Sequence, residues 1–283
     1  MLLTTECSLP SRVLRSMPPR NVRVVHRQPR QRAVANDWIL NDEPVAKIPR
    51  VPWEQVKQDV FKQWRTNDSP HHSIISLSGG GKSYLATRGL LPMRGWRRAL
   101  IIDNKGDDET LRDVGRQVRQ IPNDSRFRSK KEPDHSWYRL MVHDDWDKAR
   151  TQVRDALAKV YKQGDWTVFV DETRNLTDPR VPSLNLRNYV EQIWLRGRSR
   201  GVEMVSMTQA PRWVPSSFYD QPSFVWIGRI NDERAHQRLR EIGGLRREHL
   251  GVIQQLQRRE FLIVGDGGDY TAITKVPDLA KKG

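Results

Sequence analysis

Residues 73–83 read Ser-Ile-Ile-Ser-Leu-Ser-Gly-Gly-Gly-Lys-Ser, an apolar run that leads into three glycines and a Lys-Ser pair. The apolar run predicts a buried strand, and the Lys-Ser pair stands where a helix would begin. Glycines between the two let the backbone curl so that successive N–H groups point at one phosphate, and the helix start adds its positive dipole end. The stretch therefore predicts a phosphate-binding loop between a strand and a helix.

The loop follows the pattern G-x-x-x-x-G-K-[ST], except that Ser76 stands at the first glycine position. Lys82 is expected to reach the β- and γ-phosphates of a nucleotide, and the Ser83 hydroxyl to ligate Mg²⁺. A nucleophile elbow centred on Ser78 is a second interpretation, but it leaves the Lys-Ser pair unexplained. The candidate nucleotide-binding residues are Ser78, Gly79, Gly80, Gly81, Lys82, Ser83 and Tyr84.

Around this loop, short apolar runs alternate with longer helical patterns, which predicts an α/β fold with a mainly parallel sheet and helices on both faces. The predicted strands are 73–77, 98–103, 138–142, 167–171, 203–208 and 224–229. The predicted helices are 53–64, 82–91, 109–118, 147–163, 184–196 and 233–242. Residues 260–264 and 270–275, joined across a Gly-rich turn, predict a C-terminal β-hairpin.

A pair of acids ends one of the buried strands. Residues 167–173 read Thr-Val-Phe-Val-Asp-Glu-Thr. Asp171 is placed to hold the water shell of Mg²⁺, and Glu172 to polarise an attacking water. Alone, such an ending would also fit an acidic helix start. Together with the phosphate loop, it predicts a site that uses ATP and Mg²⁺ and hydrolyses ATP.

Residues 196–211 read Arg-Gly-Arg-Ser-Arg-Gly-Val-Glu-Met-Val-Ser-Met-Thr-Gln-Ala-Pro, and their strand delivers Gln209 to the same sheet edge. Here the chain resembles the FtsK–HerA family of DNA-pumping ATPases, over roughly residues 70–277. The matching motifs are SGGGKS (78–83), ALIIDNKG (99–106), VFVDE (168–172), RSRG (198–201), TQAP (208–211), FLIVGDG (261–267) and ITKVP (273–277).

The resemblance implies a RecA-like core that acts on double-stranded DNA, usually as a homo-hexameric ring with ATP bound between subunits. It makes Arg198 an arginine finger for the neighbouring site, with Arg200 as the reserve candidate, although both would also suit a solvated basic helix end. The Gln209 amide, at the sheet edge where ligands gather, is placed to sense the γ-phosphate or hold the water. The compact members of the family include genome-packaging ATPases of some viruses and plasmid- or phage-encoded translocases.

Composition points the same way. The 283 residues carry a formal charge of +15, from 49 Lys and Arg against 34 Asp and Glu, which favours a polyanionic partner such as nucleic acid or an anionic membrane. A single cysteine, Cys7, excludes an internal disulfide and a Cys-based zinc site. Without an apolar run of membrane-spanning length or a secretory leader, we expect a cytoplasmic protein, or a virion-associated one if it packages a genome.

Two regions are expected along the chain: a basic extended arm and linker over residues 1–50, and the RecA-like ATPase domain over 51–283. Residues 1–35 hold seven Arg and four Pro against one acid, so they cannot form a packed core. We expect them to tether the protein to DNA or to an acidic partner, such as a portal or membrane-anchored protein. A tail without a role is the alternative.

The sequence as a whole predicts an ATP-driven DNA translocase. A terminase-like packaging ATPase and a nucleotide-gated DNA-binding protein that does not travel are the alternatives. His71 and His72 suit a strand entry better than a metal site, because no third ligand lies at helical spacing. Asp103 and Lys105, near the rim of the site, suit a plain loop, with contact to the nucleotide as the alternative, and Asp107, Asp108 and Glu109 suit a helix start. Residues 122–133, which are basic, are expected to form a solvated or DNA-facing loop.

Overall fold

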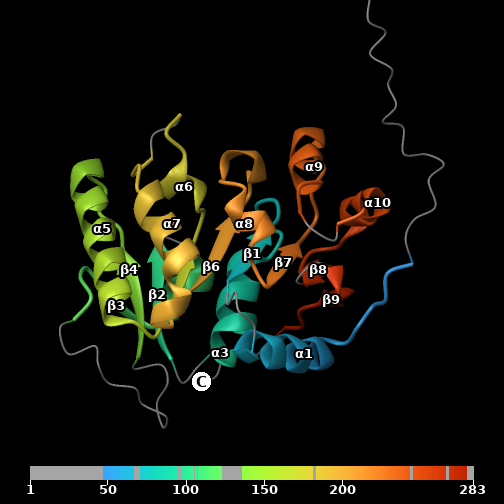
Figure 1. The fold of residues 1–283 in the computed structure, drawn as a ribbon, viewed down its shortest axis with the longest axis horizontal. Helices are drawn as coiled ribbons and strands as arrows, with labels where there is room; N and C mark the ends of the chain where they lie inside the picture. Colours follow the sequence, from blue (N-terminus) through green and yellow to red (C-terminus); the bar gives the residue numbers. More distant parts are fainter. Residues whose placement is uncertain are drawn as a thin grey trace, which may run out of the picture. The chain divides into compact units, whose positions relative to one another are not determined.

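One sheet forms the centre of the fold (Figure 1). The computed structural model describes residues 47–66, 71–94, 97–104, 106, 108–122, 136–180, 183–242, 245–265 and 268–278. Within them the strands are β1 His72–Ile75, β2 Arg98–Asp103, β3 Arg116–Val118, β4 Trp137–Met141, β5 Trp166–Val170, β6 Glu203–Thr208, β7 Phe224–Ile227, β8 Glu260–Gly265 and β9 Thr271–Lys275.

The strands lie in the order β3-β4-β2-β5-β6-β1-β7-β8-β9. The pairs from β3 to β7 are parallel, whereas β8 and β9 add an antiparallel edge. This arrangement confirms the predicted α/β fold, its mainly parallel sheet and its C-terminal hairpin. It also sets β6 between β1 and β5, so the loops that follow these three strands emerge side by side.

Helices cover both faces of the sheet. They are α1 Trp53–Thr66, α2 Lys82–Tyr84, the π-helical η1 Leu85–Leu90, α3 Leu91–Met93, α4 Glu109–Arg112, α5 Trp146–Gln163, α6 Arg174–Thr177, α7 Arg187–Arg196, α8 Ser217–Asp220, α9 Glu233–Leu239 and α10 Arg247–Gln255, with short 3-10 turns η3 Arg198–Arg200 and η4 Pro211–Trp213. Helix α1 and the run from α2 to α3 pack on one face, and α5, α7 and α10 contribute to the core on the other.

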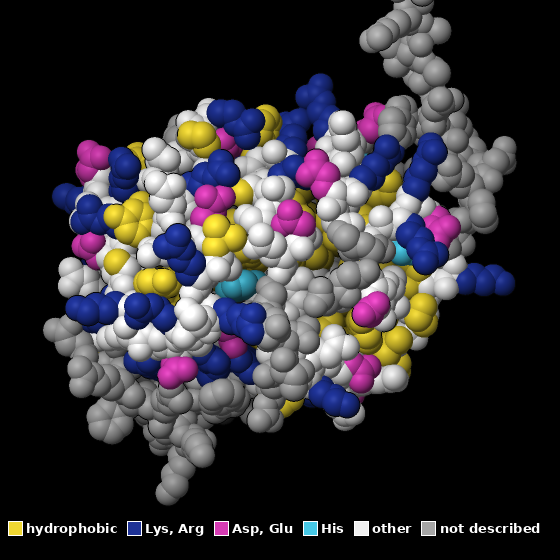
Figure 2. Space-filling model, in the orientation of Figure 1, with side chains coloured by type: hydrophobic (Ala, Val, Ile, Leu, Met, Phe, Trp, Pro, Cys, Tyr) yellow, Lys and Arg dark blue, Asp and Glu magenta, His cyan; other side chains and the backbone are white. Residues whose placement is uncertain are grey.

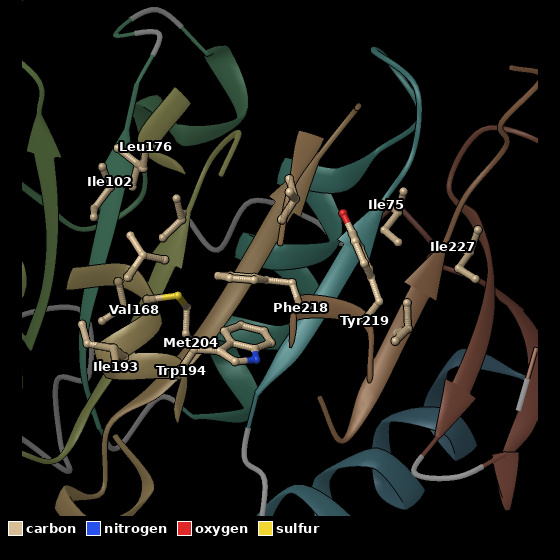
Figure 3. Close-up of a cluster of buried hydrophobic side chains, with 14 of the residues drawn as sticks. Ile75, Ile102, Val168, Leu176, Ile193, Trp194, Met204, Phe218, Tyr219 and Ile227 are labelled. Carbon is tan, nitrogen blue, oxygen red and sulfur yellow. The ribbon is translucent and has the colours of Figure 1, made fainter. Parts of the chain in front are cut away.

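Alternate residues of each strand feed these two cores, because successive side chains of a strand point to opposite faces. Ile74, Ile101 and Phe169 pack with α1 and η1. Ile75 and Ile102, each one residue later, join the other core, where Trp194 of α7 stacks on Phe218 at 4.1 Å between ring centroids (Figure 3). Burial on both faces explains why the parallel strands read as nearly continuous apolar runs.

The predicted helix 109–118 is wrong in its second half. Helix α4 ends at Arg112, and Arg116–Val118 forms the edge strand β3. Gly115 separates the two with a φ of +70°, a left-handed conformation that commonly ends a helix. A Cβ at this glycine would lie 2.9 Å from the Trp137 carbonyl oxygen, so the chain turns tightly against β4 before pairing with it.

The basic arm over residues 1–35 lies outside the described residues, as does the predicted basic loop apart from its first residue. The last residues of the predicted linker are described: Arg50 bridges to Ile273 of β9, and its guanidinium lies 2.9 Å from the Glu260 carboxylate. No helix in the described part of the chain combines the length and the apolarity that crossing a membrane requires.

Candidate nucleotide-binding site

The loop after β1 has the geometry of a phosphate-binding loop. Gly79 and Gly81 adopt left-handed conformations, with φ of +72° and +102°. A Cβ at Gly80 would lie 2.1 Å from the Ser76 hydroxyl oxygen, so glycine is required there for space. Helix α2 begins directly after the glycines, and its first N–H groups face the loop as potential anion donors.

Lys82 is the only charged residue between Ser76 and Tyr84, and it is 6% exposed. Its Nζ donates hydrogen bonds to the carbonyl oxygens of Ser76 at 2.9 Å and Leu77 at 3.0 Å. The ammonium is therefore held at the start of the loop, where its positive charge adds to that of the backbone N–H groups. That Lys82 reaches the β- and γ-phosphates of a nucleotide stays a prediction.

The acids after β5 lie at the same edge of the sheet. Asp171 is 1% exposed, and Glu172 is 7% exposed. The Glu172 carboxylate accepts hydrogen bonds from the Thr208 hydroxyl at 2.8 Å and from the Gln209 N–H at 3.0 Å. The neighbouring strands β5, β6 and β1 are thus followed by three of the predicted residues, Glu172, Gln209 and Lys82. Thr208 was not predicted, because nothing in the sequence distinguishes it from an ordinary strand threonine.

The loop after β2 also lies at this edge; its residues belong to the ALIIDNKG motif (99–106), for which the sequence leaves a plain loop and a nucleotide contact as alternatives. The Asn104 side-chain amide donates to the Asp171 carbonyl oxygen. Asp108 accepts a hydrogen bond from the Ser83 hydroxyl at 2.9 Å. The available signal was positional: in a parallel sheet, a polar loop after a strand next to β5 must end at the ligand-binding edge.

Arg259, the residue before strand β8 of the C-terminal hairpin, packs against the phosphate loop. The Arg259 N–H donates to the Gly80 carbonyl oxygen at 3.1 Å, and its Cγ lies 3.0 Å from where a Cβ of Gly81 would be. The Arg259 guanidinium sits 4.1 Å from the centre of the Tyr84 ring. The Tyr84 side chain is thereby packed on the protein.

Arg198 and Arg200 lie at the other end of β6. Both belong to η3, which precedes the first residue of β6, whereas Gln209 follows the last one. A six-residue strand spans about 20 Å, so neither arginine reaches the site of its own chain. Both side chains are exposed, and the Arg200 guanidinium stacks 4.8 Å from the Tyr161 ring centre.

The donors present fit a hydrated Mg²⁺ rather than a protein-caged metal. The described residues contain no group of three or more His, Cys, Asp or Glu able to hold a metal ion. Mg²⁺ prefers one or two protein oxygens together with substrate phosphates and water. The Ser83 hydroxyl and the buried carboxylate of Asp171 are oxygen donors of this kind.

His71 and His72 are structural residues at the start of β1, as their sequence predicts. The His71 Nδ1 accepts a hydrogen bond from the Met204 N–H at 3.1 Å, and the His72 Nδ1 accepts one from the Trp226 indole at 3.1 Å. Burial lowers the pKa of His71 from 6.5 to about 4 and that of His72 well below its usual value. Both rings are therefore neutral at pH 7.

The sequence matches no protein-family model. Over 172 residues it is 26% identical to the DNA packaging ATPase P9 of Enterobacteria phage PRD1, and this match covers 60% of the chain and 69% of P9.

Among solved structures, the chain is similar to the genome packaging NTPase B204 from Sulfolobus turreted icosahedral virus 2. The sulfate complex of B204 gives a TM-score of 0.54 at 15% identity, covering 76% of this chain and 100% of B204. Its complex with ATP-gammaS gives 0.54 at 14% identity, over 74% and 97%. VirB4 of Thermoanaerobacter pseudethanolicus gives 0.56 at 11% identity, over 78% and 93%. These likenesses establish the fold, an α/β architecture that the chain shares with B204 and VirB4.

Proposed function

We propose that this chain is a Mg²⁺-dependent ATPase that moves double-stranded DNA and packages a viral or plasmid genome. The observation that carries the proposal is that the Gly79–Ser83 loop after β1 and the Glu172 carboxylate after β5 flank the end of β6, where the Gln209 N–H donates to Glu172. The 26% sequence identity to the DNA packaging ATPase P9 supports the packaging role. The complex of B204 with ATP-gammaS supports ATP as the nucleotide.

The residues divide the work by their chemistry. Lys82 and the N–H groups of the loop bind the nucleotide phosphates and offset their charge. Ser83 and Asp171 would hold Mg²⁺, which polarises the γ-phosphate when it is bound. Glu172 orients the attacking water and takes up its proton: each of its oxygens accepts one hydrogen bond, which leaves a lone pair on each for the water.

The working assembly in this proposal is a homo-hexameric ring of the FtsK–HerA type. Arg198 lies beyond the reach of its own site and is exposed, as an arginine donated to a neighbouring subunit must be. A guanidinium supplied in this way stabilises charge on the transferred phosphoryl group. Arg200 is the reserve candidate, and its guanidinium is stacked on Tyr161 of its own chain.

Hydrolysis is tested by phosphate release from ATP with and without Mg²⁺. Lys82→Ala should abolish turnover, since it removes the positive charge at the phosphates. Lys148→Ala, on the outer helix α5, is the matched control and should keep the wild-type rate. Full activity of Lys82→Ala would show that the site is wrongly assigned.

DNA binding is tested by its salt dependence. Lys and Arg side chains are spread among Asp and Glu over the face in Figure 2, so the charge of +15 is not confined to one patch there. We expect duplex DNA of any sequence to stimulate hydrolysis. The logarithm of the affinity should fall by about 0.9 per phosphate contact for each tenfold rise in salt. Binding that is indifferent to salt would contradict this part of the proposal.

A further inference from the structure

Asp108 divides its two carboxylate oxygens between two partners. Oδ1 accepts a hydrogen bond from the Thr110 N–H at 2.8 Å and so caps α4. Oδ2 accepts a hydrogen bond from the Ser83 hydroxyl at 2.9 Å, across 25 residues of sequence. Capping accounts for the first contact only, because a helix of four residues needs no link to the phosphate loop.

The contact with Ser83 decides how that hydroxyl can be used. A serine hydroxyl has one proton and two lone pairs. Because the proton is given to Asp108, the lone pairs of the Ser83 oxygen are left for a cation. A charged acceptor also makes the hydroxyl oxygen a better donor to a metal, as carboxylates do behind metal-bound histidines. The negative charge of Asp108 lies one hydrogen bond away from Ser83, the proposed metal ligand.

The surrounding loop holds Asp108 in this position. The Asp103 carboxylate, fully buried at the end of β2, accepts a hydrogen bond from the Gly106 N–H at 2.9 Å. Asn104, the next residue, donates to the Asp171 carbonyl oxygen. The loop is therefore fixed to the Mg²⁺-binding strand end at one side and to Ser83 at the other. A solvated loop with no role would need neither attachment.

We propose that Asp108 is a positioning residue of the Mg²⁺ site, acting through Ser83. This inference rests on the proposed function, since it presumes that Ser83 ligates the metal. Asp108 orients the Ser83 hydroxyl so that its lone pairs face the ion, and it adds a negative charge behind the ligand. Removing such an outer partner costs about 10- to 100-fold in metal affinity.

The test is a titration of Mn²⁺, a paramagnetic substitute for Mg²⁺, followed by electron paramagnetic resonance with the full chain and ATPγS. Asp108→Asn keeps a side chain that caps helices well but removes the charge. It should bind Mn²⁺ about 10- to 100-fold more weakly while unfolding at the wild-type temperature. Asp145→Asn is the matched control: it changes the N-cap aspartate of α5, and Mn²⁺ affinity should stay as in the wild type.

The double variant with Ser83→Ala separates a positioning role from a general charge effect. If Asp108 acts through the hydroxyl, adding Asp108→Asn to Ser83→Ala should weaken Mn²⁺ binding no further. Full additivity of the two effects, or wild-type Mn²⁺ affinity in Asp108→Asn, would overturn the inference. If instead the wild-type protein binds no Mn²⁺ with ATPγS, or binds it equally well after Ser83→Ala, the proposed function itself fails.

Discussion

Glu172 has a backbone conformation that few non-glycine residues adopt. Its φ of +53° lies in the left-handed region, directly after the buried strand β5. Such a conformation costs of order 1 kcal/mol and persists where the surroundings enforce it. Glu172 is held in this conformation at the end of β6, because the Thr208 hydroxyl and the Gln209 N–H both donate hydrogen bonds to its carboxylate. The backbone turn therefore directs the acid toward the end of β6 and away from solvent.

Glu172→Gln tests the role of this acid. The amide has the same shape and can still accept from Thr208, so the variant should fold and bind ATP. It cannot take up a proton, and phosphate release should fall by about 10²- to 10⁴-fold. Glu191→Gln, on the exterior of α7, is the control with unchanged rate. Hydrolysis by Glu172→Gln at the wild-type rate would remove Glu172 from the chemistry.

His71 makes the stability of the fold sensitive to acid. Its ring is 2% exposed and stacks on Trp194, with ring centroids 4.5 Å apart. Because burial lowers its folded pKa from 6.5 to about 4, the unfolded chain binds the extra proton between these values, and stability falls as the pH drops through this window. Between pH 7.5 and 5 the loss from this group is about 2 kcal/mol of unfolding free energy.

The neutral variant His71→Gln checks this assignment, since it cannot gain a proton but can still accept from the Met204 N–H. Urea unfolding at pH 7.5 and pH 5 should show a smaller loss than the wild type, by about 2 kcal/mol. An unchanged loss would mean that other groups carry the acid sensitivity.

At the scale of elements, the phosphate loop departs from its pattern at Ser76 for a steric reason. The Ser76 side chain is fully buried, and its oxygen lies 2.1 Å and 2.4 Å from where a Cβ of Gly80 or Gly228 would be. The serine therefore occupies space that two glycines leave open. Glycine at the first position of the pattern is thus not needed for the loop to form.

The pairing of Ser76 with Gly80 predicts a reciprocal effect of size. Gly80→Ala should destabilise the loop by about 1–3 kcal/mol and weaken ATP binding. Adding Ser76→Gly should restore much of both, since it removes the serine oxygen. Gly251→Ala, in α10 with nothing within 4 Å of the new methyl group, is a control that should not destabilise. Thermal unfolding and ATP affinity report the outcome, and a double variant no better than Gly80→Ala would contradict the pairing.

The elements that sequence predicted best are those whose signal is local. A continuous apolar run identified the strand at 98–103, and the glycine–Lys-Ser run identified the phosphate loop. The strand Arg116–Val118 was missed because it is short, polar and exposed, and it exists only through its pairing with β4. Asp108 and Arg259 were missed for a similar reason: their contacts with the loop join segments that are distant in sequence.

At the scale of the whole molecule, the two sets of candidate catalytic groups lie at opposite edges of the sheet. Lys82, Glu172 and Gln209 follow the carboxyl ends of β1, β5 and β6, whereas Arg198 precedes β6. Figure 1 shows α6, which follows β5, at the upper ends of the central strands and α1 below their lower ends. A complete site therefore requires two copies of the chain, if Arg198 takes part in the reaction.

Mixing two inactive variants tests this requirement. Arg198→Ala should bind ATP and fail to hydrolyse it, because it lacks the finger but retains the loop. Adding Lys82→Ala protein should restore part of the activity, since mixed assemblies pair an intact loop with an intact arginine. Arg200→Ala serves as the comparison and should keep activity. Wild-type turnover by Arg198→Ala would exclude Arg198, and an active monomer would exclude the ring.

Movement along DNA is tested most directly by displacement of a triplex-forming strand from duplex DNA by this chain. With ATP and Mg²⁺, the wild type should release the third strand at a rate that follows ATP concentration, while Glu172→Gln should bind the duplex and release none. Tight DNA binding and ATP hydrolysis without any strand displacement by the wild type would contradict translocation along DNA. That result would identify a nucleotide-gated DNA-binding protein instead.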